Sequence, residues 1–171
     1  QIIKKYDVDL VIPCSDEEAL SLAKNRDLIE NTSCILACTA YETLNILSDK
    51  LKTYKILQKN NIKVPFYTAI YNHEELLNKI KLYLDKYKEM VIKPAVSRGG
   101  RNIIIINKNN YKKYTQNDFY IKRFIKLYFL ILMEKLIEPI YDIDLLSMEG
   151  NLVRSLVRRR LDSSNPNNGH L

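Results

Sequence analysis

One stretch, residues 89–106 with the sequence EMVIKPAVSRGGRNIIII, constrains the fold more than any other part of the chain. Its two apolar runs flank a loop rich in glycine and basic residues, which predicts two strands joined by a loop. The glycines leave backbone N–H groups accessible, and the basic residues supply charge that a polyphosphate would neutralise. The residues favour a phosphate-covering hairpin and, about equally, an ordinary hairpin with a basic loop. The residues concerned are Lys93, Arg98, Gly99, Gly100 and Arg101.

Length and composition indicate a globular chain. Its 171 residues suffice for one sizeable core or two small lobes. No apolar run approaches the ~20 residues that cross a bilayer, and no signal peptide is visible, so the expected compartment is the cytoplasm. The chain opens on Gln1 without a Met, and we expect its true start to be missing. Cys14, Cys34 and Cys38 have no histidine nearby, which argues against zinc and predicts free, buried thiols.

The charge is distributed unevenly. The net charge is +7, but residues 1–49 hold 4 basic and 9 acidic side chains, whereas residues 50–171 hold 23 and 11. The part that attracts anions therefore begins near Lys50. A basic surface suits nucleic acid as well as nucleotides, so a nucleic-acid-binding module remains an alternative. The chain has no helix-turn-helix, zinc-finger or RNA-binding signature that would favour it.

The N-terminal third reads as a β-α unit followed by a second strand and a helix. An apolar strand ends at Pro13, and Ser15 with Glu18 forms a capping box that starts a helix. Residues 34–37 predict the second strand and residues 41–47 a short helix.

A further helix is predicted around Lys50. Ser48 or Asp49 caps its start, and Asn60 or Asn61 ends it. Lys50 then lies in the first turn, against the dipole preference, which is mild evidence for an anion nearby. A solvated helix lysine is the commoner explanation.

The middle of the chain predicts a small α+β region. Strands are expected around Phe66, Ile92 and Ile104, and an amphipathic helix over residues 72–85. A second helix is expected near residues 118–126. His73 opens the first of these helices and is expected at the surface.

The C-terminal part predicts a strand ending at Met133 and then a hairpin. Ile143, Leu145 and Ser147 alternate along one strand, residues 149–150 form the turn, and residues 152–161 return. Alternation places Arg158 and Arg160 on one face and Arg159 on the other, and Asp144 on the partner strand is able to pair with an arginine.

Several spaced signals together resemble the ATP-grasp superfamily, and within it the carbamoyl-phosphate-synthetase-like and carboxylate-amine ligase branch. They are a DK-initiated helix, the sequence NIKVP, a strand ending in KP and the loop SRGGRN. The resemblance implies that Lys50 and Lys93 contact ATP and that the loop, beginning at Ser97, closes over its phosphates. Many members have a further glycine where this chain has Arg101 and Asn102, which implies a stiffer loop.

The resemblance also implies an adenine-binding hinge read by backbone groups. The residues are Glu134, Lys135, Leu136, Ile137 and Glu138. A plain strand crossing between lobes fits the same residues. The carboxylate that usually holds the ribose falls near Ile140, which cannot hydrogen-bond; either Glu138 or Asp142 substitutes for it, or ribose binding is weakened. Arg158 and Arg160 would lie at the phosphate end of the cleft as catalytic residues, with a surface charge run as the competing explanation.

The implied fold combines α/β and α+β parts: an incomplete ATP-grasp fold preceded by the end of a Rossmann-like pre-ATP-grasp domain. The expected parts are the pre-ATP-grasp end (1–47), a linking helix (48–64), the ATP-grasp lid (65–137) and the start of the second lobe (138–171). The implied cofactors are ATP and Mg²⁺, with the magnesium ligands expected downstream of this chain and no metal ligand within it.

The implied function is the ATP-binding part of a ligase that activates a small carboxylate as an acyl phosphate for attack by an amine or similar nucleophile. This chain alone is expected to be inactive, because the metal-binding segment lies downstream. A nucleotide-binding fragment without catalysis is the alternative.

Overall fold

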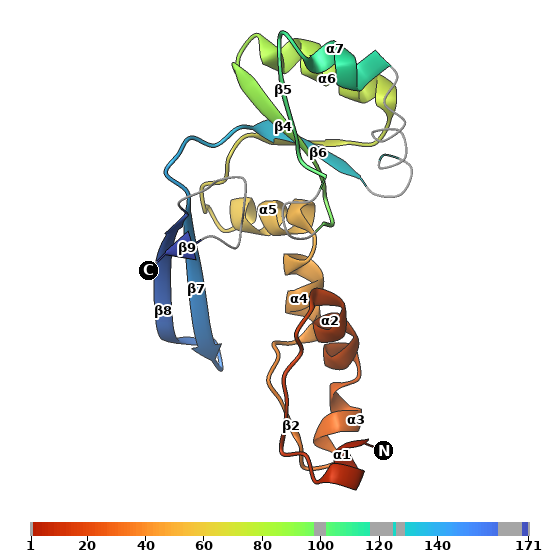
Figure 1. Cartoon of the computed structure of the whole chain (residues 1–171), viewed down its shortest axis with the longest axis vertical. Helices are drawn as coiled ribbons and strands as arrows, with labels where there is room; N and C mark the ends of the chain where they lie inside the picture. Colours follow the sequence, from red (N-terminus) through yellow and green to blue (C-terminus); the bar gives the residue numbers. More distant parts are fainter. Residues whose placement is uncertain (1, 98–101, 117–124, 126–128, 161–168, 171) are drawn as a thin grey trace. The chain divides into compact units, whose positions relative to one another are not determined.

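The computed structural model divides into two compact units, residues 1–64 and residues 65–171 (Figure 1). The residues that the structure describes are 2–97, 102–116, 125, 129–160 and 169–170. Within these residues, every helix is too short or too polar to cross a membrane.

The first unit is a small α/β arrangement. Its elements are α1 (Ile2–Tyr6), β1 (Leu10–Val11), α2 (Asp16–Lys24), α3 (Arg26–Glu30), β2 (Ile35–Leu36), α4 (Tyr41–Leu47) and α5 (Lys50–Lys59). The strands β1 and β2 pair in parallel, as expected for the end of a β-α-β unit. The buried residues Ile29, Cys34 and Leu36 form the core between α3 and the strands.

Local capping signals explain where the first unit's helices begin. The Ser15 hydroxyl accepts the Glu18 N–H at 3.3 Å, as the capping box predicts, while the Glu18 carboxylate accepts the Cys14 N–H at 2.9 Å. Asp49 caps α5 by accepting the N–H groups of Leu51 and Lys52. All three cysteines are free, as predicted, but only Cys34 is buried: Cys14 is exposed and Cys38 half-buried, so the expectation of buried thiols is wrong for Cys14.

The second unit contains a four-stranded antiparallel sheet with two helices on one face (Figure 1). Its elements are β3 (Tyr67–Ile70), α6 (His73–Leu84), β4 (Glu89–Pro94), β5 (Ile104–Asn107), α7 (Tyr111–Gln116) and β6 (Leu130–Glu134). The strand order is β3-β6-β4-β5, so β6 returns late in the chain to lie between β3 and β4. The hairpin predicted from residues 89–106 is confirmed, because β4 pairs antiparallel with β5.

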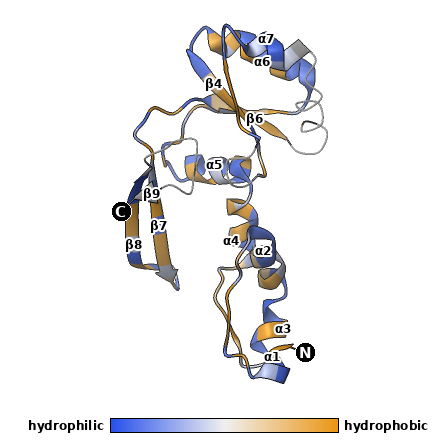
Figure 2. Ribbon diagram, in the orientation of Figure 1, coloured by the Kyte–Doolittle hydropathy of each residue, from blue (hydrophilic) through white to orange (hydrophobic). Residues whose placement is uncertain are grey.

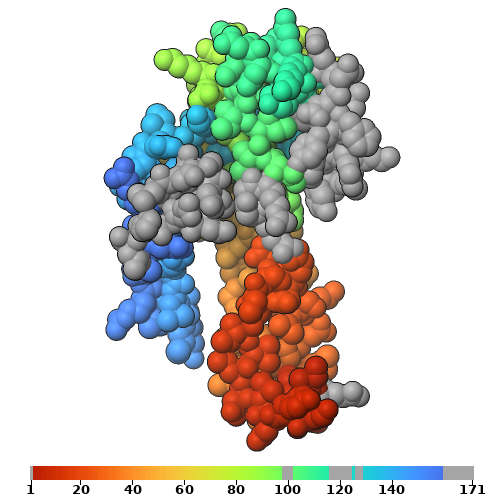
Figure 3. Space-filling view, viewed as in Figure 1, coloured from red at the N-terminus to blue at the C-terminus, as the bar shows by residue number. Residues whose placement is uncertain are grey.

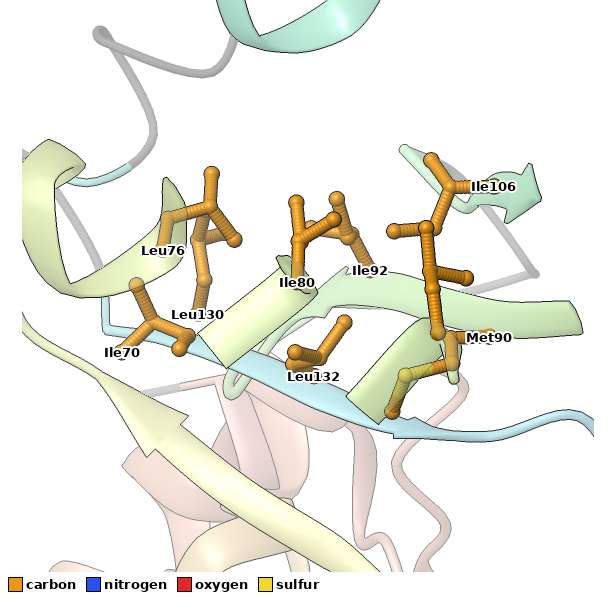
Figure 4. Packing of buried hydrophobic residues seen from close by; sticks show 9 residues of the cluster. Ile70, Leu76, Ile80, Met90, Ile92, Ile106, Leu130 and Leu132 are labelled. Carbon is orange, nitrogen blue, oxygen red and sulfur yellow. The ribbon is translucent and has the colours of Figure 1, made fainter. Parts of the chain in front are cut away.

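The core of this unit lies between α6 and one face of the sheet (Figure 4). Leu76 and Ile80 of α6 meet strand residues that alternate toward the helix, and all are fully buried. The strand residues are Ile70, Met90, Ile92, Ile106, Leu130 and Leu132. Asn72 caps α6 by accepting the Glu75 N–H at 2.8 Å, so the predicted amphipathic helix is confirmed.

The helix α7 was not predicted. Its six residues are too few for a clear period, and Asn110 precedes it with turn hydrogen bonds to Asn107 rather than a standard cap. Tyr111 and Tyr114 pack it against the core. The helix predicted near residues 118–126 lies outside the described residues, apart from Ile125.

The C-terminal hairpin consists of β7 (Tyr141–Met148) and β8 (Asn151–Arg160), with β9 (Gly169–His170) beside β8. Glu149 and Gly150 both have positive φ (50° and 78°), the conformation of a tight two-residue hairpin turn. The predicted turn and strand alternation are therefore confirmed, with one bulge between Leu146 and Ser147 that alternation did not indicate.

Candidate functional site

The side of the four-stranded sheet opposite α6 carries Lys93 among apolar residues near one end of β4, and Glu89 at the other end of the strand. Antiparallel partners share a face, and the register pairs Lys93 with Ile131, and Val91 with Met133. We call this side the Lys93 face; it consists of Tyr67, Ala69, Glu89, Val91, Lys93, Ile105, Asn107, Ile131 and Met133. A cation beside apolar residues suits a ligand that has a flat ring and an anionic group.

Lys93 is half-buried near the end of β4, and its burial lowers its pKa. Ile131, its partner on β6, is completely buried. Burial makes the positive charge of Lys93 costly, so an anion bound beside it would be favoured more strongly than beside an exposed lysine. The position of Lys93 is therefore compatible with the phosphate contact predicted from the sequence, which stays a prediction.

The glycine loop follows directly from Lys93. Ser97 is half-buried, and Asn102 resumes the described chain with a positive φ of 65°. The loop residues between them lie outside the described residues, and their predicted phosphate contacts stay a prediction. They are Arg98, Gly99, Gly100 and Arg101.

The predicted hinge follows β6, and its first two side chains have structural partners. The Glu134 carboxylate accepts the Phe66 N–H at 2.7 Å, and the Lys135 ammonium pairs with Glu89 at 2.7 Å. The Lys135 N–H also donates to the Glu89 carbonyl at 3.4 Å. Side-chain recognition of a base by this pair is therefore disfavoured.

The rest of the hinge is exposed. Leu136 is 54% and Ile137 90% exposed, and Glu138 is exposed too. Over the described residues, no hydrogen bond engages the backbone of Leu136 or Ile137. The backbone groups of Leu136 and Ile137, like those of Glu138, are therefore open to the edge of a base, and the predicted contact with adenine stays a prediction.

Lys50 belongs to the first unit, where it is half-buried in the first turn of α5, next to the capping carboxylate of Asp49. This location is the one predicted from the sequence. That Lys50 and Lys93 bind the same triphosphate stays a prediction.

The arginines of β8 divide between the two faces of the hairpin as alternation predicts. Arg158 lies opposite Asp142, and Arg159 opposite Tyr141. The Arg158 guanidinium holds Asp144 with two contacts, 2.8 Å from Nε and 3.1 Å from an Nη atom, which is a diagonal pair across the strands. Arg158 is thus positioned by Asp144, whereas the Arg160 side chain lies outside the described part of the chain.

His73 differs from the expectation of a surface residue. Its ring is half-buried, and Nε2 lies 2.7 Å from the Thr115 carbonyl oxygen of α7. Sequence reasoning missed this contact because α7 itself was not predicted. The bond ties α6 to α7, on the side of the sheet away from Lys93.

The family model described as sugar-transfer associated ATP-grasp matches residues 30–128, more than half of the chain. The chain belongs to this ATP-grasp family. The resemblance inferred from the two lysine motifs and the glycine loop is confirmed at the level of the ATP-grasp superfamily. No curated protein matches the sequence significantly.

Solved ATP-grasp ligases share the fold of this ATP-grasp chain. L-amino acid ligase from Bacillus licheniformis aligns with a TM-score of 0.66 and 18% identity, over 97% of this chain and 38% of its own. D-alanyl-alanine synthetase A from Vibrio cholerae aligns with a TM-score of 0.65 and 13% identity, over 88% of this chain and 44% of its own. A third match is the biotin carboxylase domain of Hydrogenobacter thermophilus 2-oxoglutarate carboxylase, solved with MgADP and bicarbonate. It aligns with a TM-score of 0.63 and 16% identity, over 92% of this chain and 35% of its own. The chain thus spans less than half the length of these ligases.

One contact near Lys93, between two aromatic side chains, was not predicted from the sequence. The exposed rings of Tyr71 and Phe129 contact each other at the end of the sheet where β4 leads toward the glycine loop. The two residues are far apart in sequence, and neither belongs to a motif. The pairing of β3 with β6 is what brings them together.

Proposed function

We propose that this chain is the ATP-binding part of a ligase that activates a substrate carboxylate as an acyl phosphate for attack by an amine or similar nucleophile. The observation that carries the proposal is Lys93: a half-buried cation on an apolar sheet face, directly before a basic glycine loop, in a chain of the ATP-grasp family. The cited biotin carboxylase domain binds MgADP, which supports nucleotide binding by this fold.

Each candidate residue has a distinct role in this proposal. The ammonium groups of Lys50 and Lys93 bind phosphate oxygens, and backbone groups of Leu136 and Ile137 bind the adenine edge. The loop beginning at Ser97 covers the phosphates and keeps water out. A carboxylate oxygen of the substrate attacks the γ-phosphorus and ADP leaves, so the charge that develops on the transferred group is spread over the cations.

Arg158, fixed by Asp144, is the proposed arginine at the phosphoryl-transfer end. Its guanidinium is pre-oriented by two contacts to one carboxylate, so little side-chain entropy is lost when an anion binds. Arg160 is proposed for the same role.

Magnesium needs ligands that the described residues do not assemble. No group of three or more His, Cys, Asp or Glu side chains lies close enough to hold a metal ion in the parts of the chain that the structure describes. The residues present therefore do not fit a metal site, and the downstream ligands stay a prediction. For the same reason, turnover is expected of a longer ligase rather than of this chain alone.

The proposal is tested by the affinity of the chain for ATP, measured by calorimetry, in Lys93→Ala and in the matched variant Lys88→Ala. Both lysines lie at β4, but Lys88 is exposed and precedes the strand. We expect Lys93→Ala to raise the Kd at least about tenfold, the scale of one charge-assisted phosphate contact, and Lys88→Ala to leave it within about twofold. Equal effects of the two substitutions would contradict the proposal.

A further inference from the structure

Tyr71 and Phe129 form an exposed aromatic pair at one end of the four-stranded sheet. Tyr71 directly follows β3 and Phe129 directly precedes β6, and their ring centroids are 5.0 Å apart in an edge-to-face arrangement. They remain 51% and 55% exposed. Two large aromatic side chains in contact, yet both half in solvent, present a ready apolar surface to a ligand.

The pair is connected to the end of β4. The Ala95 N–H donates to the Phe129 carbonyl at 2.8 Å, which extends the pairing of β4 with β6 by one residue beyond Pro94 and Leu130. Leu130 faces the core, so alternation places Phe129 on the Lys93 face. Phe129 is then the diagonal neighbour of Lys93, roughly 7 Å away between backbone positions.

The position along β6 separates this pair from the nucleotide. The exposed hinge positions Leu136 and Ile137 follow one end of β6, and Lys93 lies beside Ile131, the second residue of the strand. Phe129 lies at the other end, roughly 17 Å from Glu134 along a strand. If the base lies at the hinge and phosphates reach Lys93, the pair lies beyond the phosphates, where the substrate that receives the phosphoryl group must bind.

We propose that Tyr71 and Phe129 bind the sugar ring of a carboxylated sugar, that is, a hexuronic acid, which is the phosphoryl acceptor. This inference rests on the proposed function. Pyranose rings carry C–H groups on one face that pack against aromatic rings, while their hydroxyls point outward. In the described residues the Tyr71 hydroxyl makes no hydrogen bond, so it is available to a sugar hydroxyl.

Two further observations favour this substrate class over other ring-shaped carboxylates. The family to which the chain belongs is described as associated with sugar transfer. The lysine on the same face also supplies the positive charge that a carboxylate and the phosphates both require. A hexuronic acid combines the ring that the aromatic pair fits with the carboxylate that the proposed chemistry needs.

The experiment measures binding of D-glucuronate to the full chain by ligand-observed NMR and calorimetry. Two further probes are acetate, which has the carboxylate without the ring, and D-glucose, which has the ring without the carboxylate. The variants are Tyr71→Ala, Phe129→Ala and Tyr71→Phe. Tyr6→Ala is the matched control, because Tyr6 is 64% exposed and belongs to the first unit. ATP affinity and thermal unfolding are measured on every variant.

We expect glucuronate to bind more tightly than acetate or glucose, and each alanine substitution at the pair to raise its Kd about tenfold. Tyr71→Phe should retain most of the affinity because it keeps the ring, and Tyr6→Ala should change nothing. ATP affinity and unfolding temperature should stay unchanged throughout, because the side chains are exposed and lie outside the nucleotide site.

Glucuronate binding that is undetectable, equal to that of acetate, or insensitive to both alanine substitutions would overturn the inference. ATP binding that persists in that case, with its dependence on Lys93, would leave the proposed function standing. If the unaltered chain does not bind ATP, the proposed function is overturned instead, and with it the assignment of glucuronate as the acceptor.

Discussion

At the scale of the residue, the buried charge that Lys93 offers to an anionic ligand also lowers the stability of the folded protein. Its burial lowers its pKa, because the charged form is poorly solvated. A lysine held in this way lowers the stability of the free protein and raises its affinity for an anion. The ligand site and the stability of the fold therefore place opposite demands on this position.

Replacing Lys93 by methionine should separate these two demands. We expect Lys93→Met to raise the free energy of unfolding by about 1 kcal/mol while ATP binding is lost. Because the pKa of the folded lysine lies below its ordinary value of 10.5, the unfolded state binds more protons between these two pKa values, so the stability of the unaltered chain rises with pH there. The advantage of the variant should therefore shrink as pH rises through the folded-state pKa.

Denaturant unfolding across the alkaline range measures this difference, with Lys88→Met as the exposed control. A stability gap that widens with rising pH would show that the folded state favours the charged lysine, against the expectation. The exposed control should stay within about 0.5 kcal/mol of the unaltered chain.

At the scale of the element, α6 secures the sheet that carries the candidate site. Its residues Leu76, Ile80 and Leu84 fill the core, while Leu82 on the same helix is 64% exposed. The orientation of β4 and β6, and so of Lys93, depends on this packing. The Lys93 face itself contributes little to holding α6 in place, because alternation directs its residues away from the helix.

Truncating α6 in the core should therefore destabilise the second unit strongly. We expect Ile80→Ala to lower the free energy of unfolding by about 2–5 kcal/mol, since Ile80 is completely buried. Leu82→Ala removes a similar volume from an exposed position and should change the free energy by less than about 0.5 kcal/mol. Urea titrations compare the two variants, and similar losses would place Leu82 in the core.

At the scale of the whole molecule, charge and exposed apolar surface are unevenly distributed. Basic residues dominate from Lys50 onward, where the proposed anion-binding residues lie. The hairpin of β7 and β8 is largely apolar (Figure 2), and its blue side chains are visible at the surface in the space-filling view (Figure 3). One face of this hairpin carries Tyr141, Ile143, Leu145 and Val157, each at least 53% exposed.

Exposed apolar residues on a strand pair promote self-association, because the pair offers an apolar face and, among the described strands, β7 lies at the edge of its sheet. We expect Ile143→Ser with Val157→Thr to lower binding of a hydrophobic dye and light scattering by the concentrated chain. The free energy of unfolding should change by less than about 1 kcal/mol. Leu82→Ser serves as the control, and a loss of several kcal/mol in the double variant would mean that the hairpin face is buried in solution.

Short-range signals were sufficient to predict much of this chain. The capping box at Ser15, the cap of α5, which falls on Asp49 rather than Ser48, and the two hairpins depend on neighbouring residues, and the structure confirms them. The ATP-grasp superfamily followed from spaced motifs. The division into four parts, the roles of the loop and of the two lysines, and the magnesium ligands stay predictions.

The sequence alone therefore determined the capped helices, the hairpins, the family and the position of Lys93 on a strand, because caps, periodicity and turn residues act over a few positions. The short helices α1, α3 and α7 were missed. Only the tertiary structure decided the pairing of β3 with β6, the contact of Tyr71 with Phe129, the diagonal bond of Arg158 to Asp144 and the use of Glu134 to hold Phe66. These contacts join residues distant in sequence, and their register is set by which side chains the core buries, which no local pattern encodes.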